Sequence, residues 1–106
     1  MSITVVAVLQ AKTGRGQDVI DAFREVSPSV HDEQGCEMYA AHLEQGGDTV
    51  VMVERWASAE DLQAHNTGAA LVRLGGLIGD LLAKPFDVWL LDPVAMGDDR
   101  KGVIPA

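Results

Sequence analysis

The stretch VVMVERWASAEDLQAH, residues 50–65, decides the fold because it joins a strand directly to a helix. Successive side chains of a strand point to opposite faces, which places Val50, Met52, Glu54 and Trp56 on one face. The next segment begins with Ser58, whose hydroxyl can accept a hydrogen bond from the free amide of Asp61 and so cap a helix. His65 lies on this helix, and we expect it close to Glu54 and Trp56.

Strand and helix patterns also alternate in the rest of the chain. Alternation or a continuous apolar run predicts strands, and apolar residues spaced three and four apart predict helices. The predicted elements are a strand at 3–12, a helix from about Gln17, strands at 37–44 and from Thr49 joined as a hairpin, helices at 58–66 and 69–82, and a strand at 86–94.

This order, β-α-β-β-α-β, is typical of an α+β fold, the ferredoxin-like split βαβ, in which a four-stranded antiparallel sheet carries its helices on one face. The first and last strands are apolar on both sides, so the face without helices needs another cover. A second copy of the chain would supply that cover, and we therefore expect a homodimer. Residues 1–96 form one predicted domain, and residues 97–106 form a C-terminal tail.

Three glycines interrupt the predicted helix at 69–82, namely Gly75, Gly76 and Gly79. A glycine in a helix interior costs about 0.5–1 kcal/mol relative to alanine. Their presence indicates either close packing against another backbone or room left for a ligand, and the pattern leaves both interpretations open.

Composition excludes some functions. The formal net charge of −8 opposes binding to nucleic acid or to anionic membranes, since both require clustered Lys and Arg. Cys36 is the only cysteine, and the sequence shows neither a signal peptide nor an apolar run long enough for a membrane. We expect a soluble, cytoplasmic protein. The three histidines have no paired spacing, so no metal site is predicted.

Two short motifs carry a family resemblance. The first is Glu33-x-Gly35-Cys36-x-x-Tyr39, and the second is Glu54-x-Trp56 followed by a helix with Ala64-His65. Over residues 3–94 the chain resembles the antibiotic biosynthesis monooxygenase (ABM) family, whose members are dimeric α+β barrels. The resemblance to its quinol monooxygenase branch implies oxidation of a small quinol or phenolic aromatic by O2, with no metal, flavin or haem cofactor.

On this resemblance His65 would accept the phenolic proton, while Trp56 and Tyr39 would donate hydrogen bonds or stack on the substrate ring. Glu54, Asn66 and Arg73 are the further candidates for binding substrate.

Each of these residues also has a structural interpretation. His65 can close a buried hydrogen-bond network, Trp56 can be a core residue, and Arg73 can be a solvated surface residue. Glu54 needs a partner if it is buried, and Arg55 points to the opposite face. Tyr39 and His42 have opposite parity on their strand, so at most one of them faces the pocket, and the family resemblance favours Tyr39. His31, Asp32 and Glu33 would cap or solvate the end of the first helix.

Two other functions compete with the monooxygenase. The first is a non-catalytic small-molecule-binding or stress-associated dimeric protein that uses the same pocket. The second is a haem-degrading oxygenase, which is disfavoured: that branch of the family carries an asparagine on the first strand and a ligating histidine beyond the position of His65. This chain has Val5, Val6 and Val8 on the first strand, and no histidine follows His65.

Overall fold

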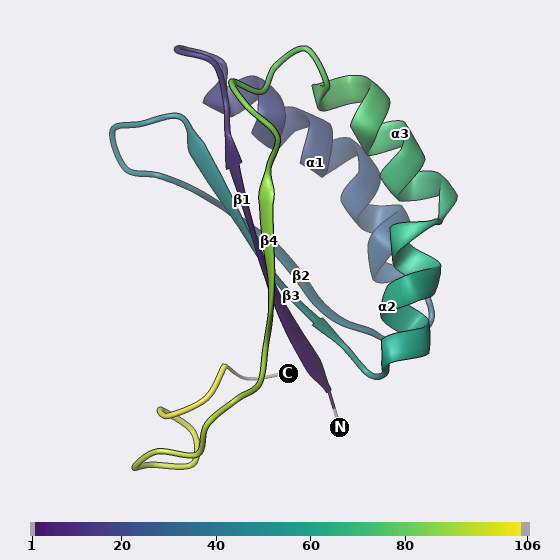
Figure 1. Cartoon of the computed structure of the whole chain (residues 1–106), viewed down its shortest axis with the longest axis vertical. Coiled ribbons are helices and arrows are strands. Elements are labelled where there is room, and N and C mark those ends of the chain that lie inside the picture. The colour runs from purple at the N-terminus through teal and green to yellow at the C-terminus, as the bar shows by residue number, and fades with distance from the viewer. Residues whose placement is uncertain (1, 105–106) are drawn as a thin grey trace.

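The computed structural model describes residues 2–104, which form four strands and three helices (Figure 1). In chain order these are β1 Ile3–Gln10, α1 Gly16–His31, β2 Cys36–Leu43, β3 Thr49–Trp56, α2 Ala59–Asn66, α3 Ala69–Ile78 and β4 Asp87–Leu91. The predicted element order is confirmed, including the interruption between the last two helices.

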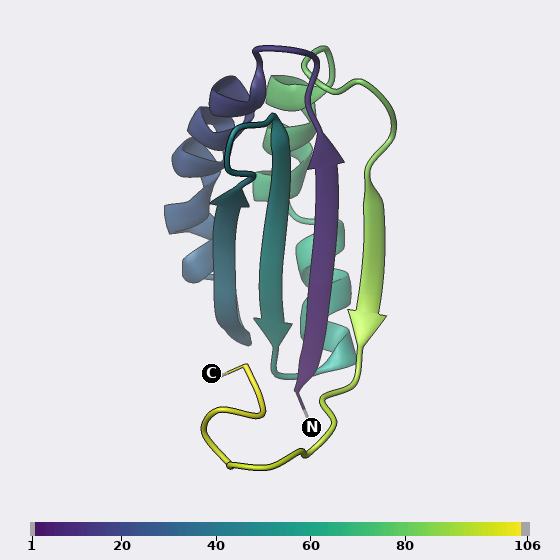
Figure 2. The ribbon, with the colours of Figure 1, turned by 90° about the vertical axis from the view of Figure 1, so that its left-hand side faces the viewer.

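The strands form one antiparallel sheet in the order β2-β3-β1-β4. All three helices lie on one face of this sheet, and the other face is open (Figures 1 and 2). This is the ferredoxin-like arrangement that the sequence predicted. None of the helices in residues 2–104 combines the length and the apolar character that a membrane crossing requires.

Three strands or helices end earlier than predicted: β1 ends at Gln10 and not at Lys12, and α3 and β4 are also shorter. α3 ends at Ile78, not at Leu82, because the chain beyond Gly79 turns to pair with the end of β1: Lys12 N–H donates to Leu81 O, and Ala83 N–H donates to Gln10 O. β4 spans Asp87–Leu91 and not 86–94, because its ladder with β1 ends where Leu91 pairs with Thr4, near the beginning of β1.

The core lies between the sheet and the helices, and β3 shows its alternation most clearly. Every second residue is buried, including Trp56 with 0% of its surface exposed and Glu54 with 7%. The other core side chains come from all the strands except β4, from the residue after β1 and from all three helices: Val5, Ala7, Leu9, Ala11, Val19, Ala22, Phe23, Val26, Val30, Tyr39, Val50, Met52, Leu62, Leu74 and Ile78. The predicted alternation is confirmed.

The open face presents apolar side chains to its surroundings. Register places Val6 between Val53 on one side and Trp89 on the other, and Trp89 is 51% exposed. Figure 2 views this face, with the chain after β4 passing below the strand ends. That tail contacts the sheet where Arg55 Nη1 donates to Ile104 O at 2.7 Å.

Candidate functional site

A buried polar network lies where β3 meets α2. Trp56 Nε1 donates to Glu54 Oε1 at 3.1 Å, and the His65 ring stacks on the Trp56 indole with ring centres 4.4 Å apart. His65 is 3% exposed. The Ser58 hydroxyl accepts from the Asp61 amide at 3.1 Å, so the predicted cap forms and α2 turns back over the strand. The prediction that these three residues lie together is confirmed.

Glu33 completes this network from the loop between α1 and β2. Its Oε1 lies 2.7 Å from His65 Nδ1, while His65 Nε2 lies 3.8 Å from Glu54 Oε1. The imidazole is therefore held between two carboxylates. The sequence pattern places Glu33 at the end of the first helix and does not indicate this contact. The hairpin register could have revealed it, because Cys36 pairs with Trp56 and so brings the residues before β2 next to the start of α2.

Gly35 fixes the loop that carries Glu33. Its φ is +78°, and a Cβ there would collide with the Asp61 carboxylate. Its carbonyl accepts from the Ala57 amide at 2.8 Å. A glycine is thus required at this position, both for its backbone conformation and for the close approach to α2.

The surroundings change the proton affinity of two side chains in the site. Burial raises the pKa of the Glu54 carboxyl, although the Trp56 hydrogen bond and His65 act in the opposite direction. Burial also raises the pKa of Tyr39, and the nearby charge of Glu54 adds to that effect. Glu54 is thus a better proton acceptor than a carboxylate in water, and Tyr39 is a neutral phenol.

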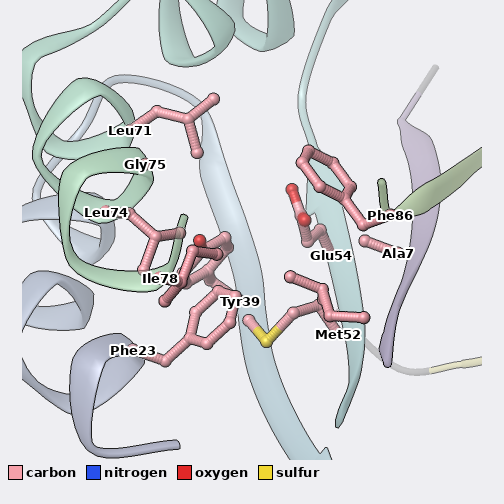
Figure 3. Close-up of a pocket in the computed structure, with 11 residues that line it drawn as sticks. Ala7, Phe23, Tyr39, Met52, Glu54, Leu71, Leu74, Gly75, Ile78 and Phe86 are labelled. Carbon is pink, nitrogen blue, oxygen red and sulfur yellow. The ribbon is translucent and has the colours of Figure 1, made fainter. Parts of the chain in front are cut away.

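Next to the network, a cavity of about 140 Å³ lies between α3 and the sheet (Figure 3). Tyr39 and Glu54 are the polar side chains in its lining. The remaining lining residues are Ala7, Leu9, Phe23, Met52, Leu71, Leu74, Gly75, Ile78 and Phe86. Figure 3 shows Glu54 and Phe86 on the sheet side, across from Leu71 and Leu74 of α3. The site is an apolar chamber with a carboxyl group in one wall.

A second cavity of about 390 Å³ adjoins the first. The two share Ala7, Glu54, Leu71 and Phe86 in their walls. His65 and Asn66 line the second cavity. Glu54 therefore borders both cavities, and His65 lies behind the wall of the first cavity, next to Glu54 and edge-on to the Tyr39 ring.

The structure does not bring every candidate residue to these cavities. Trp56 lines neither, has no exposed surface, and uses its indole N–H on Glu54. Arg73 is 59% exposed and pairs with Glu25 at 2.9 Å across the outer surface of α1 and α3. Its solvated interpretation is the one that this placement favours. Tyr39 lines the first cavity, whereas His42 lies exposed on the other side of β2, as their parity predicted.

Within residues 2–104, no three His, Cys, Asp or Glu side chains are placed to hold one metal ion. The network itself shows why, since Glu33 and Glu54 contact opposite nitrogens of His65 and do not converge on one point.

The fold and site together define a small α+β domain with an apolar chamber next to a buried carboxylate–histidine network. Comparison with known sequences identifies the family: the profile of "Antibiotic biosynthesis monooxygenase" matches residues 2–73, and the chain belongs to this family. The chain is also 32% identical over 74 residues to the "Probable quinol monooxygenase YgiN" of Escherichia coli K12, which covers 59% of this chain and 71% of that protein.

Solved structures show the same fold. The "Putative antibiotic biosynthesis monooxygenase from Nitrosomonas europaea" superposes with a TM-score of 0.80 at 16% identity, covering 85% of this chain and 88% of that one. PA3566 from Pseudomonas aeruginosa gives a TM-score of 0.80 at 21% identity, covering 89% and 95%. Rv0793 from Mycobacterium tuberculosis gives 0.71 at 22% identity, covering 92% and 100%. At these identities the likeness establishes the fold.

Proposed function

We propose that this protein is a cofactor-independent monooxygenase that oxidises a small quinol or phenolic aromatic with O2. The observation that carries the proposal is the apolar cavity with the Glu54 carboxyl in its wall and His65 and Glu33 behind it. Family membership and the similarity to a protein named as a quinol monooxygenase support the same reaction.

The proposed reaction needs no external reductant. A quinol and O2 give a hydroxyquinone and one water: one oxygen atom enters the ring as a hydroxyl group, and the other leaves as water. The substrate supplies four electrons, two when quinol becomes quinone and two when a ring C–H becomes C–OH. The protein's task is to accept the phenolic proton, orient the ring and exclude water.

Each residue of the site has a role in this proposal. Glu54 takes the phenolic proton, because its raised pKa brings it closer to that of a phenol. His65 is the next acceptor behind it, and Glu33 positions the His65 ring through Nδ1. Tyr39 donates a hydrogen bond to the substrate, and Asn66 contributes from the adjoining cavity. Trp56 acts indirectly, by fixing Glu54 and His65.

We further propose that the active form is a homodimer in which two open sheet faces pack together. The support is the apolar row across that face, formed by Val53, Val6 and Trp89, because a soluble monomer rarely leaves such a surface uncovered.

Oxygen uptake tests the reaction. Purified, metal-stripped protein is mixed with a panel of quinols under ¹⁸O2, with catalase present or absent to detect H2O2. Monooxygenation should consume one O2 per quinol and place one ¹⁸O atom in the product without forming H2O2. His65→Ala and Glu54→Gln should lose most of this activity. Gln63→Ala, an exposed change on the same helix, should retain it.

The controls give the result a clear meaning. Simple oxidation of the quinol would yield H2O2 and no ¹⁸O in the ring, which contradicts a monooxygenase. Wild-type rates in His65→Ala would remove His65 from the mechanism, provided that circular dichroism shows the variant folded.

A non-catalytic binding protein is the second candidate. It is favoured by the completeness of the network, since Glu54 accepts a hydrogen bond from Trp56 and each ring nitrogen of His65 already has a carboxylate near it. A rise in melting temperature with phenols, without O2 uptake or product, would support this function over the enzyme.

A further inference from the structure

We infer that Gly75 determines which ligands the first cavity admits, because the ring of the ligand fills the space where a side chain at this position would lie. The inference rests on the proposed function for the ligand class, a hydroxylated aromatic. It concerns binding, so it can be tested apart from turnover.

Gly75 interrupts the apolar stripe of α3. Leu71, Leu74 and Ile78 lie four, one and three positions from it, and all four residues line the cavity. An amphipathic helix ordinarily carries an apolar side chain at each such position. Figure 3 shows Gly75 between the leucines on the wall across from Glu54. At Gly75 the helical wall is therefore bare backbone.

Neither backbone geometry nor packing requires this glycine. Its φ is not among the positive values, and a Cβ built on it would meet no atom within 4 Å. The contrast with Gly35 is direct, since a Cβ there would collide with Asp61. An interior glycine also weakens a helix relative to alanine. Of the two interpretations that the sequence left open, the structure favours space for a ligand over close packing at Gly75.

The opposite wall indicates which ligand fits. Glu54 provides the acceptor for a hydroxyl group, and apolar side chains surround the rest of the chamber. Among the described residues 2–104, no Lys or Arg lines either cavity, so a ligand carrying a carboxylate would face Glu54 without a counter-charge. The structure assigns a flat, uncharged aromatic whose hydroxyl points to Glu54 and whose ring extends toward Gly75. Larger ring systems should depend on Gly75 more than small ones.

Gly76 offers a matched control. It lies in the same helix, a Cβ there also meets no atom within 4 Å, and it lines neither of the two cavities. Alanine at either position should raise the melting temperature by a similar amount, because both changes stabilise the helix. Leucine at the two positions should separate their effects on binding.

Calorimetric titration with phenol and with 1-naphthol measures this difference. Gly75→Leu should weaken 1-naphthol binding about tenfold or more, since forcing extra atoms into an occupied space is costly, and should weaken phenol binding less. Gly75→Ala should fall between wild type and Gly75→Leu. Gly76→Leu should bind both probes as wild type does.

Three results would overturn the inference: unchanged 1-naphthol affinity in Gly75→Leu, a melting temperature of Gly75→Ala below wild type, or no binding of either probe to the wild-type protein. Binding that depends on Gly75 in a protein that consumes no O2 with any quinol would refute the proposed reaction and leave this inference standing. Oxidation of a quinol by a protein whose 1-naphthol affinity is unchanged in Gly75→Leu would refute this inference and leave the proposed reaction standing.

Discussion

The two faces of the sheet contain similar apolar residues in different surroundings. On the helix-facing side, Trp56 is fully buried by its own chain, and its neighbours form the polar network and the cavity wall. On the open side, Trp89 keeps 51% of its surface exposed, and Val53 and Val6 lie in the same row. The helices of the same chain cover one face of the sheet, and the other face is open.

This difference separates two kinds of stability. Side chains on the helix-facing side contribute to folding of the single chain, because unfolding exposes them to water. Those on the open side can contribute fully only when a second molecule covers them. Mutations on the helix-facing side should therefore change the free energy of unfolding of the single chain, whereas mutations on the open side should change the association of two chains.

The two tryptophans should show the largest contrast. Trp56→Ala leaves a large cavity in the core and should lower the free energy of unfolding by about 3–5 kcal/mol. Trp89→Ala should change it by only about 0.5 kcal/mol when the chains are separate, because much of the ring is already in water. Urea unfolding at low protein concentration measures both. Equal losses would show that the faces do not differ in this way.

A charge on the open face should separate the proposed dimer. Val53→Glu buries a carboxylate between two sheets without a partner and should weaken association by roughly 2–3 kcal/mol, equivalent to about a hundredfold. Sedimentation velocity at several concentrations would show the shift to single chains. Val72→Glu places the same change on an exposed residue of α3 and should leave the wild-type profile. A wild-type protein that is monomeric at micromolar concentration would contradict the dimer itself.

The smallest effect concerns the proton on Glu54. Because its pKa in the folded protein lies above the unfolded value of 4.5, its contribution to stability is fully present below that pH and is lost as the pH rises through the folded pKa. Glu54→Gln remains neutral throughout. Wild type should therefore lose stability relative to Glu54→Gln as the pH rises above 4.5, as unfolding curves between about pH 4 and about pH 8 would show. Relative stabilities that stay constant, or a gain in the stability of wild type relative to Glu54→Gln as the pH rises, would contradict the raised pKa.

Local patterns predicted much of this structure correctly. Three features could be predicted from the sequence because each depends on residues close together in the chain: the alternation in β3, the Ser58 cap and the element order. The ends of α3 and β4 were not, because their lengths depend on where β1 offers backbone groups for pairing. The helical pattern of the sequence extends through Leu82, but the chain after Gly79 forms hydrogen bonds with the end of β1 instead.

The candidate site likewise contains some contacts that the sequence predicted and others that it did not. Glu54, Trp56 and His65 were predicted together because they lie within one strand–turn–helix unit. Glu33 contacts His65 from 32 residues away, and that contact depends on the β2–β3 register and on Gly35 meeting Asp61. Arg73 was named for its charge, which indicates nothing about the side of α3 on which it lies.

The sequence by itself determined the ferredoxin-like order of elements, the buried face of β3 and the proximity of Glu54, Trp56 and His65, since short-range periodicity and capping fix these. Only the tertiary structure decided that Glu33 holds His65, that Arg73 lies outside and that open space adjoins Gly75. The physical reason is that contacts between distant segments and the space left between packed layers depend on how whole elements meet, and no local pattern of residues encodes that.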